Sequence, residues 1–100
     1  MEFIGIFPNV ASDKSQQAIC FRVARLLKQE REMRGLSMNL LAERAGLSQQ
    51  MVSYVEREMR NPTLETLLRM AAALNIDLSR TLRQAIREVR KVSTKPVRRR

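Results

Sequence analysis

Four polar side chains between positions 49 and 54 repeat at the spacing that places residues on one face of a helix. Gln49 and Gln50 precede Ser53 and Tyr54, respectively, by four positions, and residues four apart are neighbours on a helix surface. A glutamine amide has both a donor and an acceptor, which match N7 and N6 of adenine in the major groove of DNA. These four residues therefore predict contacts to base edges. The simpler alternative is an ordinary solvated helix face.

The residues around this segment have the types that two helices need where they meet at a tight corner. A small residue in the first helix allows close crossing, and a glycine four positions later tolerates the left-handed conformation of the turn. An apolar anchor and a capping residue follow, and two aliphatic residues three apart hold the second helix from inside. The sequence supplies, in this order, Ala42, Gly46, Leu47, Ser48, Val52 and Val55. The joint pattern predicts a helix-turn-helix.

Apolar residues at helical periodicity, with polar residues suited to capping, divide the chain into five predicted helices. Gly35 and Gly46 have the positions of helix ends, and Asn61-Pro62 marks a turn. The expected N-caps are Ser37, Ser48, Thr63 and, for the last helix, either Asp77 or Ser79. The predicted helices span about 17–34, 37–46, 48–57, 63–74 and 77–92.

Length and composition fit one small all-α domain. Of the 100 residues, 44% are hydrophobic and 29% are charged, and only three glycines and three prolines interrupt runs of strong helix formers. We therefore expect an all-α, compact five-helix bundle with an irregular N-terminal leader and a basic C-terminal tail. The predicted organisation is a leader at 1–17, a helix-turn-helix domain at 18–79, an amphipathic basic helix at 80–92 and a basic tail at 93–100.

The formal net charge of +9 favours an anionic partner, but the charge is distributed unevenly. Residues 80–100 contain nine Lys or Arg and one Glu, a balance of +8, whereas residues 1–79 contain ten basic and nine acidic residues, a balance of +1. Recognition by the central body must therefore depend on local arrangement. With no His and a single Cys, neither a metal site nor a disulfide framework is expected. No nucleophile with its base is evident, so we predict no enzyme activity and no cofactor.

The chain is similar to the phage-repressor-like (Cro/repressor, or XRE-type) family of helix-turn-helix regulators over roughly residues 19–79. The segments that carry the similarity are REMRGLS at 31–37, LAERAGLS at 41–48, VSYVER at 52–57 and NPTLETL at 61–67. The resemblance implies a lambda-repressor-like fold that binds double-stranded DNA, with the helix at about 48–57 in the major groove. It places Gln49 and Gln50 at base edges. It also implies a sequence-specific transcription regulator, and more specifically a repressor.

The family pattern also implies a salt bridge between Arg31 and Glu56, which would tie the first helix to the third; the alternative is two unrelated surface charges. Two positions depart from the pattern. Relatives commonly have a phosphate-binding glutamine where this chain has Met38, and a glycine where it has Glu58, whose charge would repel a phosphate. Contacts to the DNA backbone are expected from Ser48, Arg57, Arg60 and Asn61.

Apolar residues of the last predicted helix recur at intervals of four and three residues, which is the pattern of a coiled-coil seam. The seam consists of Leu78, Leu82, Ala85, Val89 and Val92, with Ile86 beside it, and the opposite side holds Arg80, Arg83, Arg87 and Arg90. The start of the seam can pack on the chain's own core, but beyond Ala85 we expect the helix to outrun so small a core. We therefore predict a homodimer, with two recognition helices about 34 Å apart. The predicted interface contains Leu82, Ala85, Ile86, Val89 and Val92.

Two other function classes fit parts of the sequence. An antitoxin-like module would bind a toxin-like protein through the leader or the last helix, with DNA contact secondary; a co-purifying partner would favour it. Attachment to a membrane surface through the basic helix is weakened by the lack of Trp and Phe on its apolar face, and we predict no membrane association. The tail at 93–100 either follows a DNA groove or serves as a solubilising end. The expected location is the cytoplasm, at the nucleoid.

Overall fold

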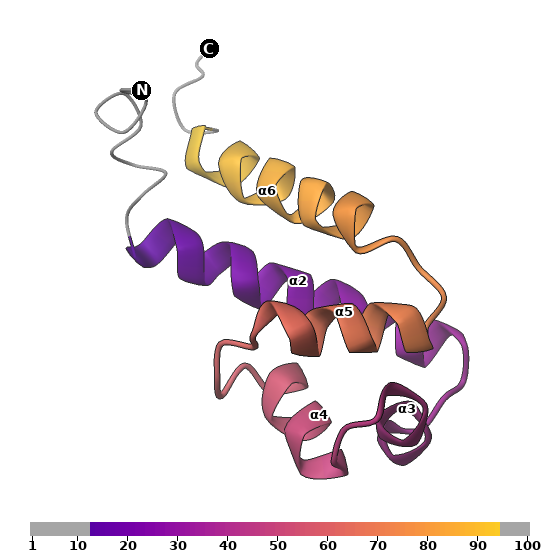
Figure 1. Ribbon diagram of the computed structural model, residues 1–100. Coiled ribbons are helices and arrows are strands. Elements are labelled where there is room, and N and C mark those ends of the chain that lie inside the picture. Colours follow the sequence, from indigo (N-terminus) through magenta and orange to yellow (C-terminus); the bar gives the residue numbers. More distant parts are fainter. Residues whose placement is uncertain (1–12, 95–100) are drawn as a thin grey trace.

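The computed structural model describes residues 13–94, and within this range the chain forms five α-helices and no strand (Figure 1). Side chains are described from position 14 to position 91. The helices are α2 (Asp13–Met33), α3 (Met38–Ala45), α4 (Gln49–Glu56), α5 (Leu64–Ala73) and α6 (Leu78–Thr94). The prediction of an all-α bundle with five helices is confirmed.

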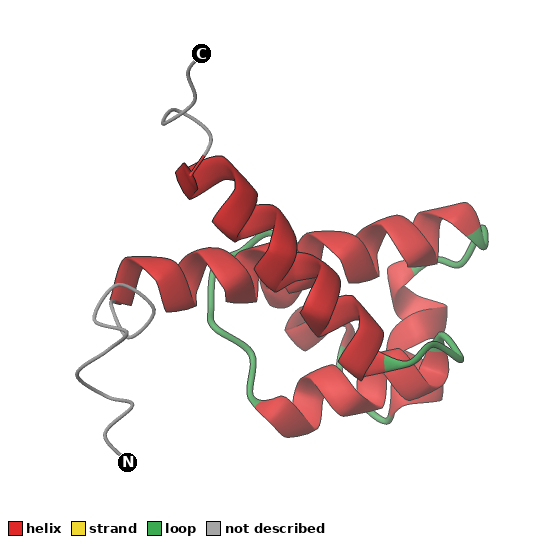
Figure 2. Ribbon diagram, turned by 90° about the horizontal axis from the view of Figure 1, so that it is seen from above, coloured by secondary structure: helices red, strands yellow, loops and turns green. Residues whose placement is uncertain are grey.

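The long helix α2 lies between α6 on one side and α3 and α4 on the other, and α5 contacts α6 as well. Helix α6 crosses one side of α2 obliquely, while α3 and α4 lie on the other side and α5 contacts α3 and α6 (Figures 1 and 2). Arg22 on α2 pairs with Glu88 on α6 at 3.6 Å, and Glu30 lines a hollow together with Arg80. The earlier α2 residue, Arg22, thus meets the later α6 residue, Glu88, and the later one, Glu30, lies near the earlier one, Arg80. The two helices therefore run in opposite directions.

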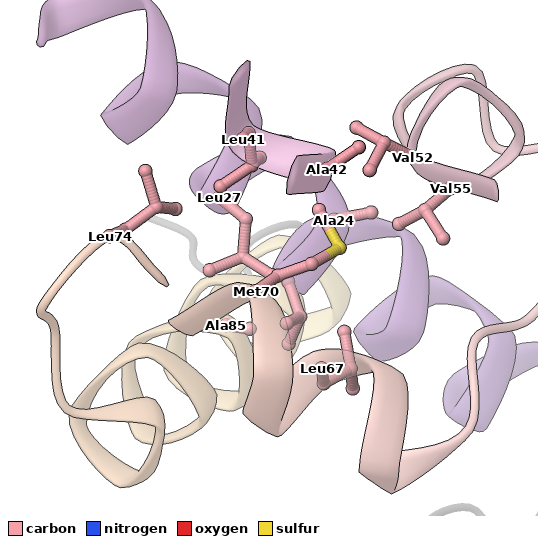
Figure 3. Close-up of a cluster of buried hydrophobic side chains, with 11 residues drawn as sticks. Ala24, Leu27, Leu41, Ala42, Val52, Val55, Leu67, Met70, Leu74 and Ala85 are labelled. Carbon is pink, nitrogen blue, oxygen red and sulfur yellow. The ribbon is translucent and has the colours of Figure 1, made fainter. Parts of the chain in front are cut away.

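The core is built from aliphatic side chains of all five helices, and Figure 3 shows them converging on Leu27 and Met70. The largest side chains that are fully buried are Leu27, Leu41, Met70, Leu74, Val23, Val52 and Val55. Burying one such side chain contributes about 1.5–3 kcal/mol. Because α3 and α4 each contribute to this cluster, the core fixes the corner between them.

Polar side chains begin four of the helices as predicted. Ser37, Ser48 and Thr63 each accept a hydrogen bond from the backbone N–H three residues later, at 3.0, 3.0 and 3.1 Å, which satisfies a donor that the helix leaves unpaired. Of the two alternatives for α6, Asp77 is the cap, since its carboxylate accepts from the hydroxyl and the backbone N–H of Ser79. These hydrogen bonds from Ser79 lower the pKa of Asp77 below its usual value.

Two helix boundaries differ from the prediction. Helix α2 begins at Asp13, so residues 13–17 belong to this helix rather than to an irregular leader, and α6 continues to Thr94, into the predicted tail. Helix α2 can begin early because residues 13–16 include no glycine or proline. Helix α6 is supported along its length by its packing on α2. The remaining predictions for the leader and the tail fall on 1–12 and 95–100, outside the described residues.

The packing of α6 on α2 also corrects one prediction about the dimer interface. Ala85 is fully buried in the chain's own core, where it joins the cluster around Leu27 (Figure 3), and it is therefore closed to a partner. Ile86 and Val89 are half-buried, and Leu82 is 38% exposed. The side chain of Val92 lies outside the described residues. The physical reason is that α6 packs on α2 and places Ala85 in the same cluster as Val23, Ala24 and Leu27.

Candidate nucleic-acid interface

Gly46 forms the corner between α3 and α4. Its backbone is left-handed, with φ 71° and ψ 33°, a conformation that costs other residues energy because of their Cβ atom. The next residue, Leu47, donates its N–H to the carbonyl oxygen of Ala42 at 2.9 Å, which closes the end of α3. A Cβ at Gly46 would lie 3.0 Å from Nη1 of Arg69. The predicted role of Gly46 as the turn residue is confirmed.

Helix α4 is held by its inner face. Val52 and Val55 are buried completely, and Ala42 of α3 is almost as buried, so the two helices cross closely, as the small residue allows. Met51 is partly buried against the same core. Because these residues fix the inner face, Gln49 and Gln50 are turned outward, whereas Glu56 at the end of α4 is buried. Figure 1 shows that α4 lies at the end of the molecule that is far from α6.

The outer face of α4 brings together three of the predicted site residues. The Gln50 amide donates to the hydroxyl oxygen of Tyr54 at 2.6 Å, and the guanidinium carbon of Arg60 lies 4.9 Å from the centre of the Tyr54 ring. A cation over an aromatic face is attracted by the ring quadrupole. These contacts join two side chains of α4 to Arg60, which lies beyond the end of the helix, and they reduce the entropy lost when the three bind a partner.

The chemistry left on this face suits the edge of a base pair. An amide NH₂ group has two donors, so Gln50 keeps one N–H and its carbonyl oxygen after binding Tyr54. This donor and acceptor match N7 and N6 of adenine. Gln49 is exposed and Ser53 is half-buried on neighbouring positions. The arrangement can therefore present several hydrogen-bonding groups to a groove.

The residues expected to contact the DNA backbone do not all lie on the same surface. Ser48 and Arg57 are exposed at the two ends of α4, and the Ser48 hydroxyl can still donate while its oxygen caps the helix. Asn61, in contrast, lines a hollow beside Gln16, Gln17 and Cys20 of α2. The structure thus groups Arg60 with Tyr54, but places Asn61 next to α2.

The salt bridge implied by the family pattern is present. Nε of Arg31 lies 2.7 Å from one carboxylate oxygen of Glu56, and Nη2 lies 3.0 Å from the other. A third nitrogen of Arg31 donates to the backbone oxygen of Leu36 at 2.6 Å. The exposed fraction is 11% for the Arg31 side chain and 2% for that of Glu56. Hydrogen bonding to Glu56 raises the pKa of Arg31 above its usual value, so the arginine remains charged.

The structure shows the surroundings of Met38 and Glu58, the two positions that depart from the family pattern. Met38 packs, partly buried, against the core, so this side chain contributes to packing and supplies no hydrogen bond to a phosphate. Glu58 adopts a left-handed conformation, with φ 59°, as a glycine would, and its carboxylate pairs with Arg25 on α2 at 2.9 Å. The pairing partly neutralises the charge that was expected to repel a phosphate.

Sequence reasoning missed a contribution of Arg69 to the corner. Its side chain pairs with Glu65 at 3.0 Å and donates to the backbone oxygen of Ala45 at 3.5 Å, beside Gly46. The spacing of four residues between Glu65 and Arg69 was the available signal.

Within residues 13–94, no helix has the length and apolar character needed to cross a membrane.

Two comparisons with curated proteins give significant similarity. Over 53 residues the chain is 43% identical to the HTH-type transcriptional regulator SutR of Escherichia coli (strain K12), a match that covers 53% of this chain and 30% of that protein. Over 69 residues it is 38% identical to the control protein C.SmaI of Serratia marcescens, a match that covers 64% of this chain and 82% of the relative. The chain thus spans less than a third of the first relative and most of the second.

The helix-turn-helix family matches residues 27–80, which is more than half of the chain. This range contains the corner at Gly46, the buried pair of Arg31 and Glu56, and the whole of α4. Both the geometry of the corner and the sequence match therefore lead to the same conclusion. The chain belongs to the XRE-type helix-turn-helix family of DNA-binding transcription regulators.

Proposed function

We propose that this chain is a sequence-specific DNA-binding regulator that inserts α4 into the major groove and acts as a repressor. The observation that supports this most strongly is the orientation of α4. Val52 and Val55 are locked in the core, while Gln49 and Gln50, at the start of the helix, are exposed. In helix-turn-helix proteins the first residues of the second helix reach base edges. Repression follows simply if the bound protein blocks access to a promoter.

The proposal includes a homodimer, since two copies of α4 related by a two-fold axis would read a near-palindromic site with half-sites about 34 Å apart. Because Ala85 is buried, the contact must use other apolar side chains. Those that are exposed include Leu64 and Leu68 on α5 and Leu82 on α6. Light scattering at micromolar concentration should report the mass of two chains. A monomer both with and without DNA would contradict the dimer.

The base-reading role of Gln50 is tested by replacing it with alanine. The probe is a duplex that the wild-type chain selects from a randomised pool, and its scrambled sequence is the reference. Gln50→Ala should lose about 1–3 kcal/mol of binding free energy on the selected duplex and little on the scrambled one. A reporter placed behind the selected sequence should be repressed by the wild type and released by this variant.

The matched control is Gln29→Ala, which truncates an exposed glutamine on α2 and should leave both affinities unchanged. Equal losses on the two duplexes with Gln50→Ala would mean that this residue does not read bases. If no duplex is enriched from the pool, sequence-specific binding itself is wrong.

A further inference from the structure

The outward face of α6 is basic. Arg80, Arg83 and Arg87 are exposed there, at intervals of three and four residues, which places them on one side of a helix. Arg90 and Lys91 are exposed on the same helix. The helix contains one acidic residue, Glu88, at 3.6 Å from Arg22 of α2. The face therefore presents a row of positive charge.

The burial of Ala85 fixes the direction of this row. Arg83 and Arg87 lie two residues before and after Ala85, and two residues correspond to a rotation of about 200° around a helix axis. Since Ala85 is fully buried in the core, the two arginines point away from the body of the protein. Within residues 13–94, neither Arg83 nor Arg87 has an ion-pair partner.

The basic face of α6 lies on the opposite side of the molecule from α4. Figures 1 and 2 agree that α6 covers one side of α2 and that α3 and α4 lie on the other. A duplex that receives α4 in its groove would therefore leave the basic face of α6 directed away from it. Any anionic partner of this face is a separate segment or a separate molecule.

We infer that the outward face of α6 binds the phosphate backbone of a second DNA segment, so that one protein can bridge two duplexes. The exposed guanidinium groups suit phosphates, and a helical row of them suits a repeating polyanion. A membrane surface is a poorer match, because the apolar side on which α6 would insert is already packed on α2. The α6 contact stands independently, whereas bridging rests on the proposed function of α4.

The test uses the full chain with Arg83→Gln and Arg87→Gln together, since glutamine keeps helix propensity and removes the charge. The selected duplex is immobilised on beads and saturated with protein, and a fluorescent 30-bp duplex of random sequence is then added. The wild type should retain the second duplex, and the double variant should retain at least about tenfold less. In direct titration of the random duplex, the log–log salt dependence should become shallower by about two units.

The matched control is Lys28→Gln with Arg34→Gln, which removes the same charge from α2 and from the turn that follows it and should retain the second duplex. Equal retention by the α6 variant and the wild type would overturn the inference, as would an equal loss in the control. Loss of the selected duplex by the α6 variant would place α6 in the same interface as α4, which also overturns it. Binding to phosphatidylglycerol vesicles that depends on Arg83 and Arg87, without retention of DNA, would assign the face to membranes instead.

The two proposals fail separately. If no sequence is selected from the pool, the function of α4 is wrong, and the α6 contact is decided by the titration with random duplex alone. The variant Gln50→Ala should bind the selected duplex more weakly and keep the wild-type salt dependence contributed by α6. An unchanged salt dependence in the α6 double variant would refute the α6 contact whatever α4 does.

Discussion

Replacing Glu56 by alanine should lower the free energy of unfolding by about 3–5 kcal/mol. It leaves the buried charge of Arg31 with only the exposed carboxylate of Glu32, 3.9 Å away. The two carboxylate oxygens of Glu56 accept from Nε and Nη2 of Arg31 at 2.7 and 3.0 Å, a paired geometry that few surface salt bridges have. A small domain has about 5–15 kcal/mol of stability in total. The loss would therefore be a large part of the whole.

Urea unfolding followed by circular dichroism measures this difference. The matched control is Glu30→Ala, which breaks the pair of Glu30 with Arg34, where both side chains are more than a third exposed. An exposed pair four residues apart contributes only about 0.3–0.5 kcal/mol. If Glu56→Ala unfolds at the same urea concentration as Glu30→Ala, the buried pair does not stabilise the fold.

A double variant separates the interaction from the cost of an orphaned charge. Arg31→Met combined with Glu56→Leu removes both charges and keeps apolar volume, and such replacements of buried pairs are often neutral. We expect the double variant to regain most of the stability that Glu56→Ala loses. The part that is not regained reports the hydrogen bond from Arg31 to the backbone of Leu36.

The corner between α3 and α4 was predictable because its determinants are local. Ser37 and Ser48 cap the helix that each precedes, and Gly46 supplies a conformation that depends on its own backbone. Each of these requirements acts within about four residues along the chain. The sequence pattern therefore predicted both helices and their boundaries to within a residue.

The packing of α6 was not predictable in the same way. Whether Ala85 contacts a partner or the chain's own core depends on how α6 packs on α2, where Ala85 joins Val23, Ala24 and Leu27, and no local signal in the sequence fixes that packing. The periodicity of α6 shows that one side is covered, but it does not show by what. The tertiary contact between α2 and α6 decided the outcome.

Within the candidate site, sequence reasoning gave the residues but not their pairings. Gln50 and Tyr54 were predicted on one face, and the structure adds their hydrogen bond and the stacking of Arg60. The pair of Arg25 and Glu58 joins positions 33 residues apart, for which a single sequence has no signal. Arg31 and Glu56 were paired through the family resemblance, since their separation along the chain is similarly long.

The second large effect is expected for Leu41→Ala, in the core behind the corner. Leu41 belongs to α3 and is 0% exposed, and Figure 3 shows it facing Leu27. Truncating a buried leucine removes its transfer free energy and leaves a cavity, which together cost about 2–5 kcal/mol. The midpoint of urea unfolding should fall accordingly. The matched control is Met33→Ala at the end of α2, where the methionine is 78% exposed and the change should stay within about 0.5 kcal/mol.

The DNA affinity of Leu41→Ala then tests whether Leu41 only stabilises the fold or also sets the orientation of α4. Val52 and Val55 remain buried in this variant, and the outer face of α4 is untouched. Affinity for the selected duplex, corrected for the folded fraction, should therefore match the wild type. A further loss after this correction would mean that Leu41 sets the angle between α3 and α4. In that case the corner at Gly46 would not be sufficient to position the recognition helix.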